Sequence, residues 1–307
     1  MTATATQAGS TSARPAETPP PRRIEWTDVL LWAWGIGVFI FLFVPILVIV
    51  VYSFNAGRYL ETWQGFGFEA FQNLWNNGPI HDAFKTSIVA AMGASVLATI
   101  LGTLAGLALA RKPGKWTVGF LFVVALVLVT PEIVDAISLL LWYVFIGGPF
   151  GNGFSAHIAG MPLFGLNRLF VGHGLFATAV VTLIVRARMS GVDESLEEAA
   201  ADLYAPPMRR FRQITLPLVM PAVLASLLLA FSLSLDNTII STFTSVAGAT
   251  PWPVYVWSAL RSILRPEIAA MSTVMLALTL FALGCVALVL RRSGDSSTDI
   301  AKTMAGG

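Results

Sequence analysis

The sequence predicts an all-α membrane protein with six transmembrane helices, on three grounds. The 307 residues are 56% hydrophobic and only 12% charged, with a mean hydropathy of +0.74, whereas about a quarter of the residues in a soluble domain are charged. Several apolar runs reach the length of about 20 residues that a helix needs to cross a hydrocarbon core of about 30 Å. Basic residues also gather in alternate loops between these runs. These observations exclude an ordinary soluble domain.

Six segments are long and apolar enough to serve as spans. In chain order they cover about residues 30–54, 84–110, 116–146, 169–187, 216–237 and 268–290. They make up a transmembrane domain of residues 28–293. A tail rich in Thr, Ala and Pro (1–27) precedes this domain and a polar tail (294–307) follows it. The N-terminal tail cannot form a core and is expected to be disordered.

Two of the spans have distinctive features. Residues 84–110 carry Gly102-x-x-x-Gly106, a small-residue pattern that lets helices approach closely in lipid and predicts a helix at the centre of the bundle. Residues 116–146 are interrupted at Thr130-Pro131-Glu132 and are too short for two crossings of about 20 residues each, so they predict one broken span. Nearer the C-terminus, residues 242–266 mix Trp, Tyr and Arg with apolar residues, which predicts an amphipathic helix at the membrane surface.

The distribution of Lys and Arg predicts the orientation of the chain. With the N-terminus inside and six crossings, 14 of the 19 basic residues fall on the inside and 5 on the outside. Basic residues concentrate in cytoplasmic loops, so this arrangement places both termini in the cytoplasm. It also places the polar segment 190–215 in the cytoplasm, while loops 55–83 and 252–266 face outward.

Acidic residues beside two of the breaks between helices predict a polar path through the membrane. Glu132 and Asp135 follow the interruption of the third span, and Asp236 ends the fifth. A carboxylate at mid-bilayer costs about 2.5–3.5 kcal/mol on insertion scales, so such residues are usually functional. A broken helix is tolerated where it is covered by protein or lines a wet cavity. The three acids therefore predict a translocation path for a cationic solute.

A structural explanation competes for these polar residues. Thr130 as N-cap, Pro131 at the first helical position and an acid in the first turn make a favourable helix start, which would account for Glu132. Asp236 would need no functional role if it lay near the lipid headgroups. His173, near the start of the fourth span, is expected to be a hydrogen-bonded interfacial residue rather than a proton relay.

The sequence gives no support for catalytic chemistry. The single Cys285 lies within an apolar run and the three histidines are scattered singly, so neither an intrachain disulfide nor a metal site is predicted. The signatures of metalloproteases, serine hydrolases and ATP-binding loops are absent from the sequence. We therefore expect no catalytic residues, no cofactor and no ATP binding by this chain itself.

The segment 193–221 is the longest polar interlude between spans. Acids crowd its start, where the positive end of a helix dipole favours them. The apolar residues that follow at helical spacing are Leu196, Ala199, Ala200 and Leu203. Pro206-Pro207 then ends this helix, because proline lacks an amide hydrogen and disfavours helix before it. A basic stretch leads on into the fifth span, so the pattern predicts two short helices joined by a turn beside the membrane.

Within this segment, Glu198-Ala199-Ala200 and Ile214-x-Leu216-Pro217 carry a specific spacing. They resemble the EAA loop of binding-protein-dependent ABC importer permeases, in which EAA is followed by three residues, Gly, nine residues and I-x-L-P. The resemblance implies that residues 190–215 form a coupling loop that docks on a partner ATPase. The coupling residues it implies are Glu198, Ala199, Ala200, Asp202, Tyr204, Pro206, Ile214, Leu216 and Pro217.

One position departs from this pattern, because Tyr204 stands where the family has glycine. A glycine just past a helix end normally supplies the left-handed conformation. Tyr204 would adopt that conformation at a cost of about 1–2 kcal/mol, or the paired prolines would make a different turn.

Three further stretches resemble permeases of the spermidine/putrescine type. They are Pro131-Glu132-Ile133-Val134, Ser232-Leu233-Ser234-Leu235-Asp236-Asn237 and Pro266-Glu267-Ile268-Ala269-Ala270. This subfamily usually has a second acid where Asn237 stands and Asn where Ala269 stands. The resemblance adds Ser232 and Asn237 to the predicted translocation path of Glu132, Asp135 and Asp236.

The resemblance, which covers about residues 30–292, implies a type I ABC importer permease fold in a bacterial inner or plasma membrane. It implies a second permease subunit, two ATPase subunits that bind ATP and Mg, and a substrate-binding protein, and a polyamine such as putrescine or spermidine as the solute. Alternatives are a permease for an iron complex, thiamine or an amino-acid derivative. A stand-alone secondary transporter would often show inverted repeats, which we do not find, and an intramembrane enzyme would need a nucleophile or metal constellation that the sequence lacks.

Overall fold

The computed structural model describes residues 26–60, 62–111, 114–262 and 264–292. Within these ranges, five helices are long and apolar enough to cross a membrane, or six when one bent pair counts as a single span. This confirms the predicted all-α membrane class. The predicted tails lie outside the described residues, apart from Trp26 and Thr27, which begin the first helix.

The chain divides into two compact units, residues 1–48 and 49–307. The first unit contains most of helix α1 (Trp26–Tyr52), which contains Pro45 and buries none of its residues. Its surface is apolar on all sides, so lipid or another protein surface must cover it in a membrane.

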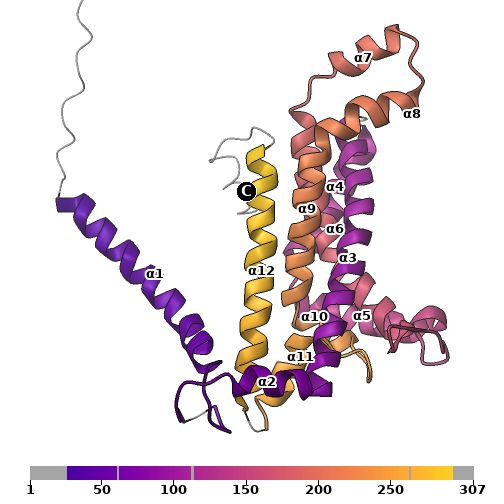
Figure 1. The fold of residues 1–307 in the computed structure, drawn as a ribbon. Coiled ribbons are helices and arrows are strands. Elements are labelled where there is room, and N and C mark those ends of the chain that lie inside the picture. The colour runs from indigo at the N-terminus through magenta and orange to yellow at the C-terminus, as the bar shows by residue number, and fades with distance from the viewer. Residues whose placement is uncertain (1–25, 61, 112–113, 263, 293–307) are drawn as a thin grey trace, which may run out of the picture. The chain divides into compact units, whose positions relative to one another are not determined.

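Four long helices form the body of the second unit (Figure 1). They are α3 (Gly78–Arg111), α6 (Leu163–Ser190), α9 (Leu216–Asp236) and α12 (Pro266–Arg292). Helices α3 and α6 lie along one another, both contact α9, and α12 packs on α9. A Cβ atom on Gly102 would come within 2.6 Å of Val181, and one on Gly106 within 2.8 Å of the Thr182 carbonyl oxygen. The Gly-x-x-x-Gly pattern therefore marks a central helix, as the sequence predicts.

The broken span consists of α4 (Lys115–Val129) and α5 (Glu132–Ile146), which bend by 106° at the break. The expectation that Thr130 caps the second half is wrong. Thr130 ends α4 instead, and its hydroxyl donates to the Leu126 carbonyl oxygen at 2.6 Å, while Pro131 takes the N-cap position of α5. A threonine hydroxyl bonded back along its own helix is no longer free to cap the next one.

Short elements lie at the two ends of the second unit (Figure 1). One end holds α7 (Ser195–Asp202) and α8 (Pro207–Arg210), which continues through a π-helical turn, η2 (Phe211–Thr215), into α9. The other end holds α2 (Glu69–Asn76), α10 (Ile239–Thr244), α11 (Trp252–Ala259), the 3-10 turn η1 (Gly148–Phe150) and a hairpin of β1 (His157–Ile158) with β2 (Met161–Pro162).

Three sequence boundaries differ from the structure. The single surface helix predicted over 242–266 is wrong, since α10 and α11 are separated by a turn in which Gly248 has a φ of +82°. Helix α3 begins at Gly78 rather than near residue 84. Helix α6 begins at Leu163 rather than near residue 169, so Arg168 lies inside the helix. The Arg168 Nε donates to the Phe150 carbonyl oxygen at 2.7 Å, and its guanidinium lies over the Tyr143 ring, 5.9 Å from the ring centroid. Because these contacts satisfy its charge and donors, Arg168 can be accommodated within the helix and does not mark where the helix begins.

Candidate functional site

The short helix α7 is initiated by local hydrogen bonds and charge. Asp193 Oδ1 accepts a hydrogen bond from the Ser195 amide at 2.9 Å. That bond holds the pKa of the exposed Asp193 carboxyl below its usual range, because it stabilises the charged form. Glu197 and Glu198 occupy the first turn, where the helix dipole favours negative charge. An eight-residue helix can thus form although none of its residues is buried.

The far end of α7 closes with a Schellman motif built on a tyrosine. The Tyr204 amide donates to the Ala201 carbonyl oxygen at 2.9 Å and the Ala205 amide to that of Ala200 at 3.1 Å, the two bonds that define this motif. Tyr204 has a φ of +57°, so it takes the left-handed conformation expected of the family glycine. This geometry carries the strain of about 1–2 kcal/mol anticipated from the sequence.

Large apolar side chains point outward at this end of the unit. Tyr204 is 95% exposed, Leu203 83% and Met208 74%, and Leu196 is also exposed. The predicted coupling residues Glu198, Ala199, Asp202, Pro206 and Pro217 are exposed as well, whereas Ala200, Ile214 and Leu216 are partly covered. An apolar patch on an extramembrane loop is typical of a protein contact surface.

Sequence reasoning missed Arg111, the residue that fixes this loop to the bundle. Its Nε lies 3.3 Å from Glu197 Oε1, and its NH1 lies 3.1 Å from Glu194 Oε1 and 3.3 Å from the Val192 carbonyl oxygen. Thr215 Oγ1 donates to the same Glu197 oxygen at 2.8 Å. The only sequence signal was a basic residue at the end of a span, which we counted for topology alone.

Two of the predicted path residues meet at the break between helices. Asn237, the C-cap residue just after α9, donates from Nδ2 to Glu132 Oε1 in the first turn of α5 at 2.6 Å. Asn237 Oδ1 in turn accepts from the Ile240 amide at the start of α10 at 3.1 Å. The amide therefore links α9, α5 and α10, and it satisfies one oxygen of a partly buried carboxylate.

The other three path residues lie close by in sequence but take no part in this contact. Asp135 is half-buried in the same first turn of α5 as Glu132. Asp236 is exposed at the last position of α9, and Ser232 is buried one turn earlier in that helix. Negative charge is thus gathered where α9 ends and α5 begins.

His173 lies beside this region and is buried within the bundle. It is 3% exposed, with Nδ1 hydrogen-bonded to Ser234 Oγ at 2.6 Å and Nε2 to Ser241 Oγ at 2.8 Å. One imidazole therefore ties α6 to both α9 and α10. The expectation of a hydrogen-bonded histidine is confirmed, and its position at the membrane interface stays a prediction. Sequence reasoning named Ser234 only within a stretch that resembles the family and did not single out Ser241, because neither serine shows a spacing that pairs it with His173.

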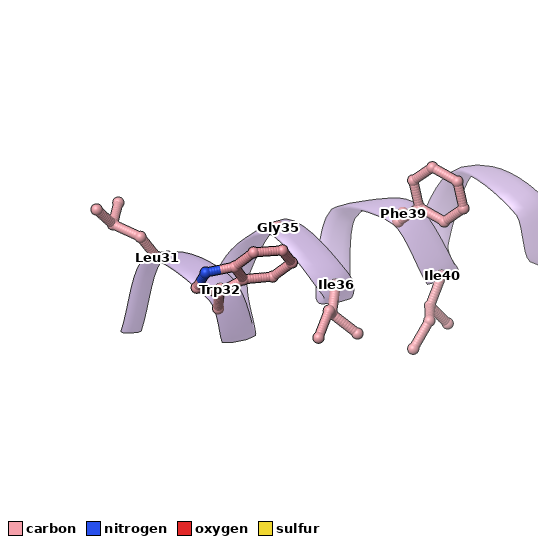
Figure 2. Close-up of a pocket in the computed structure, with 6 residues that line it drawn as sticks. All are labelled: Leu31, Trp32, Gly35, Ile36, Phe39 and Ile40. Carbon is pink, nitrogen blue, oxygen red and sulfur yellow. The ribbon is translucent and has the colours of Figure 1, made fainter. Parts of the chain in front are cut away.

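Other candidate sites are less convincing. No group of three metal-ligating side chains occurs in the described part of the chain. A hollow of about 410 Å³ lies on α1, and Figure 2 shows Leu31, Trp32, Gly35, Ile36, Phe39 and Ile40 around it. Trp32 contributes the only side-chain nitrogen among these six residues. Such a hollow suits apolar packing better than recognition of a charged solute.

Comparisons with known proteins agree with the motifs. The family model of the binding-protein-dependent transport system inner membrane component matches residues 98–295. The putrescine transport system permease protein PotI of Escherichia coli K12 is 37% identical over 229 residues, which cover 74% of this chain and 78% of that protein. The spermidine/putrescine transport system permease protein PotC of Haemophilus influenzae is 34% identical over 244 residues, covering 78% of this chain and 88% of that protein.

Solved structures share the fold at lower identity. A bacterial ABC transporter involved in the import of the acidic polysaccharide alginate matches with a TM-score of 0.60 at 16% identity, over 90% of this chain and 99% of that chain. The inward-facing MetNI methionine ABC transporter matches with a TM-score of 0.53 at 14% identity, over 71% of this chain and 99% of that chain. The predicted type I importer permease fold is therefore confirmed, and these two transporters differ widely in the solutes they are named for.

Proposed function

We infer that this chain, which belongs to the family of binding-protein-dependent transport system inner membrane components, forms the translocation path for a small organic polycation in an ATP-driven importer. The observation that supports a cationic solute is the set of acids at the break between α9 and α5, with Glu132 held by Asn237. The relatives named for putrescine and spermidine transport support a polyamine over other solutes.

Polyamine ammonium groups suit this site chemically. Each ammonium offers several donors to carboxylate oxygens, and a diammonium solute can contact two acids at once. Glu132, Asp135 and Asp236 supply the carboxylates, and Ser232 and Asn237 supply neutral partners. The acids also lower the cost of bringing a cation out of water, because an opposite charge compensates part of its desolvation.

The exposed surface of α7 is the proposed contact with an ATPase subunit. Leu203 and Tyr204, which follow α7, and Met208 of α8 would enter a groove on the partner, with Glu198 of α7 at the rim for a basic side chain. Because the chain carries no ATP-binding loop, ATP and Mg would bind to two partner ATPase subunits.

The remaining parts of the assembly follow from this orientation. Both termini and α7 would face the cytoplasm of a bacterial cell, in agreement with the excess of basic residues on that side. A second permease, homologous or identical, would complete the path. Loop 55–83 and the α11 region, at the opposite end of the unit, would receive the substrate-binding protein.

Alternating access would then connect the two ends. ATP binding would close the ATPase pair and move α7, and the bundle would open outward to take the solute from its binding protein. Hydrolysis of ATP would return the bundle to its starting conformation. Each step needs the two ends of the bundle to be linked by packed elements, which the long helices α3, α6 and α9 supply.

Co-expression of the chain with candidate ATPase, permease and binding-protein partners tests this proposal. The complex should co-purify with an ATPase, and in proteoliposomes it should take up labelled putrescine or spermidine only with ATP and the binding protein. Competition only by an iron complex, thiamine or an amino-acid derivative would keep the importer and reject the polyamine. Uptake without any ATPase would instead favour a stand-alone transporter.

A further inference from the structure

Two adjacent acids in α7 face different surroundings. Glu198 is exposed, whereas the Glu197 side chain is 26% exposed and its Oε1 is bonded to both Thr215 and Arg111. The two carboxylates therefore have different contacts, although the sequence motif contains only Glu198. Glu198 is free to meet a partner, and Glu197 points back toward its own bundle.

Arg111 joins three segments that the chain keeps far apart in sequence. It is the last residue of α3, and its side chain is only 15% exposed. Its guanidinium contacts the Val192 carbonyl oxygen just after α6, and the carboxylates of Glu194 and Glu197 at the start of α7. The planar guanidinium holds its donors in a rigid fork that suits these separate acceptors, whereas a lysine ammonium is a compact charge on a flexible stem.

The contact with Thr215 extends the link to a fourth segment. Thr215 is buried at the end of the π-helical turn η2, immediately before α9 begins. Glu197 thus lies between the cytoplasmic end of α3 and the start of α9. Single π-helical turns of this kind are often found at functional sites, because they distort the regular helix.

Helix α3 extends this link to the far end of the unit. Gly102 and Gly106 seat it tightly against α6, so that it cannot tilt without displacing Val181 and Thr182. Near its other end, Ser87 Oγ accepts the Trp252 amide of α11 at 2.7 Å. A displacement of the Arg111 end would therefore be carried along a rigid helix to the α11 region.

We propose that Arg111 and Glu197 form an intramolecular link that transmits movement of α7 to α3, with both acting as positioning residues rather than as contacts to the ATPase. This inference rests on the proposed function, in which α7 docks on an ATPase. It separates two roles: the exposed residues of α7 bind the ATPase, and the Arg111–Glu197 pair transmits the movement of α7 to α3. A part-buried ion pair with two further bonds resists separation better than an exposed pair.

The test uses the complete complex in lipid with the binding protein present. Glu197→Gln, Arg111→Gln, the double variant and the charge-reversed pair Arg111→Glu/Glu197→Arg are compared with wild type. Glu194→Gln is the matched control, because Glu194 pairs with the same arginine but is 66% exposed. Two quantities are measured: the amount of ATPase that co-purifies, and the ATPase rate with and without solute-loaded binding protein.

The link predicts that both single variants keep their ATPase subunits and lose at least fivefold of the stimulation by loaded binding protein. The double variant should lose no more than either single variant, and the charge-reversed pair should regain at least half of the stimulation. Glu194→Gln should lose less than twofold. Arg111→Lys, which keeps the charge but not the planar fork, should fall between wild type and Arg111→Gln.

Four results would overturn the proposal in different ways. Stimulation within twofold of wild type in Arg111→Gln and Glu197→Gln, or losses that multiply in the double variant, would reject the link alone. Loss of the ATPase subunits from Glu197→Gln would assign Glu197 to docking instead. Absence of an ATPase from the wild-type complex would reject the proposed function itself.

Discussion

Asn237 Nδ2 donates a 2.6 Å hydrogen bond to Glu132 Oε1, joining the end of α9 to the first turn of α5. The spermidine/putrescine permeases that the sequence resembles usually have an acid where Asn237 stands. An asparagine there supplies a donor to Glu132, whereas a second acid would repel it. A substitution at Glu132 that keeps an acceptor oxygen can therefore change the charge at this point of the proposed path without breaking the contact.

Glu132→Gln is the variant that isolates this charge. Glutamine keeps an oxygen that accepts from Asn237 but removes the negative charge, so the helix contact persists while cation attraction weakens. We expect the KM for putrescine uptake to rise about tenfold, which corresponds to about 1.4 kcal/mol. The control is Asp28→Asn, an acid in the first turn of α1. A KM for Glu132→Gln within twofold of wild type would show that Glu132 has only a structural role.

Tyr204→Gly should relieve the backbone strain in the turn that follows α7. The residue has a φ of +57°, and removing the Cβ penalty should stabilise the turn by about 1 kcal/mol. Amide hydrogen exchange in α7 should then slow about fivefold, since 1 kcal/mol is a factor of about five. Tyr204→Ala, which lacks the ring but keeps the strain, separates the two effects. Equal exchange rates in both variants would rule out strain at this position.

His173→Ala should destabilise the bundle. It removes two hydrogen bonds between helices, to Ser234 and Ser241, and such bonds in membranes contribute about 0.6–1.7 kcal/mol each. We expect a loss of about 1–3 kcal/mol in the free energy of unfolding, measured by denaturant titration in mixed micelles. Ser234→Ala removes one bond only and should lose less. No loss in His173→Ala would mean that the buried network contributes nothing to stability.

Gly106→Ala should also destabilise the bundle by separating α3 from α6. The added Cβ would lie 2.8 Å from the Thr182 carbonyl oxygen, and overpacking of this kind costs about 1–3 kcal/mol. Gly284→Ala in α12 is a matched control, because nothing lies within 4 Å of a Cβ there. Equal stability of the two variants would contradict the close packing of α3 on α6.

Local patterns predicted much of the fold from the sequence. The apolar lengths gave the spans, Gly102 and Gly106 identified the central helix, and the motif spacing pointed to a left-handed residue at Tyr204. Each of these features depends on residues within a few turns of one another. Such patterns can be recognised in a single sequence because they follow from local backbone geometry.

Features that depend on distant partners could not be read in the same way. Arg168 was expected to precede the fourth span, but it lies inside α6, where its guanidinium contacts the Phe150 carbonyl oxygen and the Tyr143 ring. Arg111 meets acceptors more than 80 positions away in sequence. In both cases, tertiary contacts decide where a charged residue lies, and composition gives no sign of them.

The proposed polyamine importer is tested most directly by the ATPase rate of the purified complex in lipid, measured with its binding protein and a panel of polyamines and neutral solutes. We predict that polyamine-loaded binding protein raises the rate of the wild-type complex, and that Asp236→Asn loses coupled uptake. Stimulation by neutral solutes alone, with Asp236→Asn transporting as well as wild type, would contradict the account.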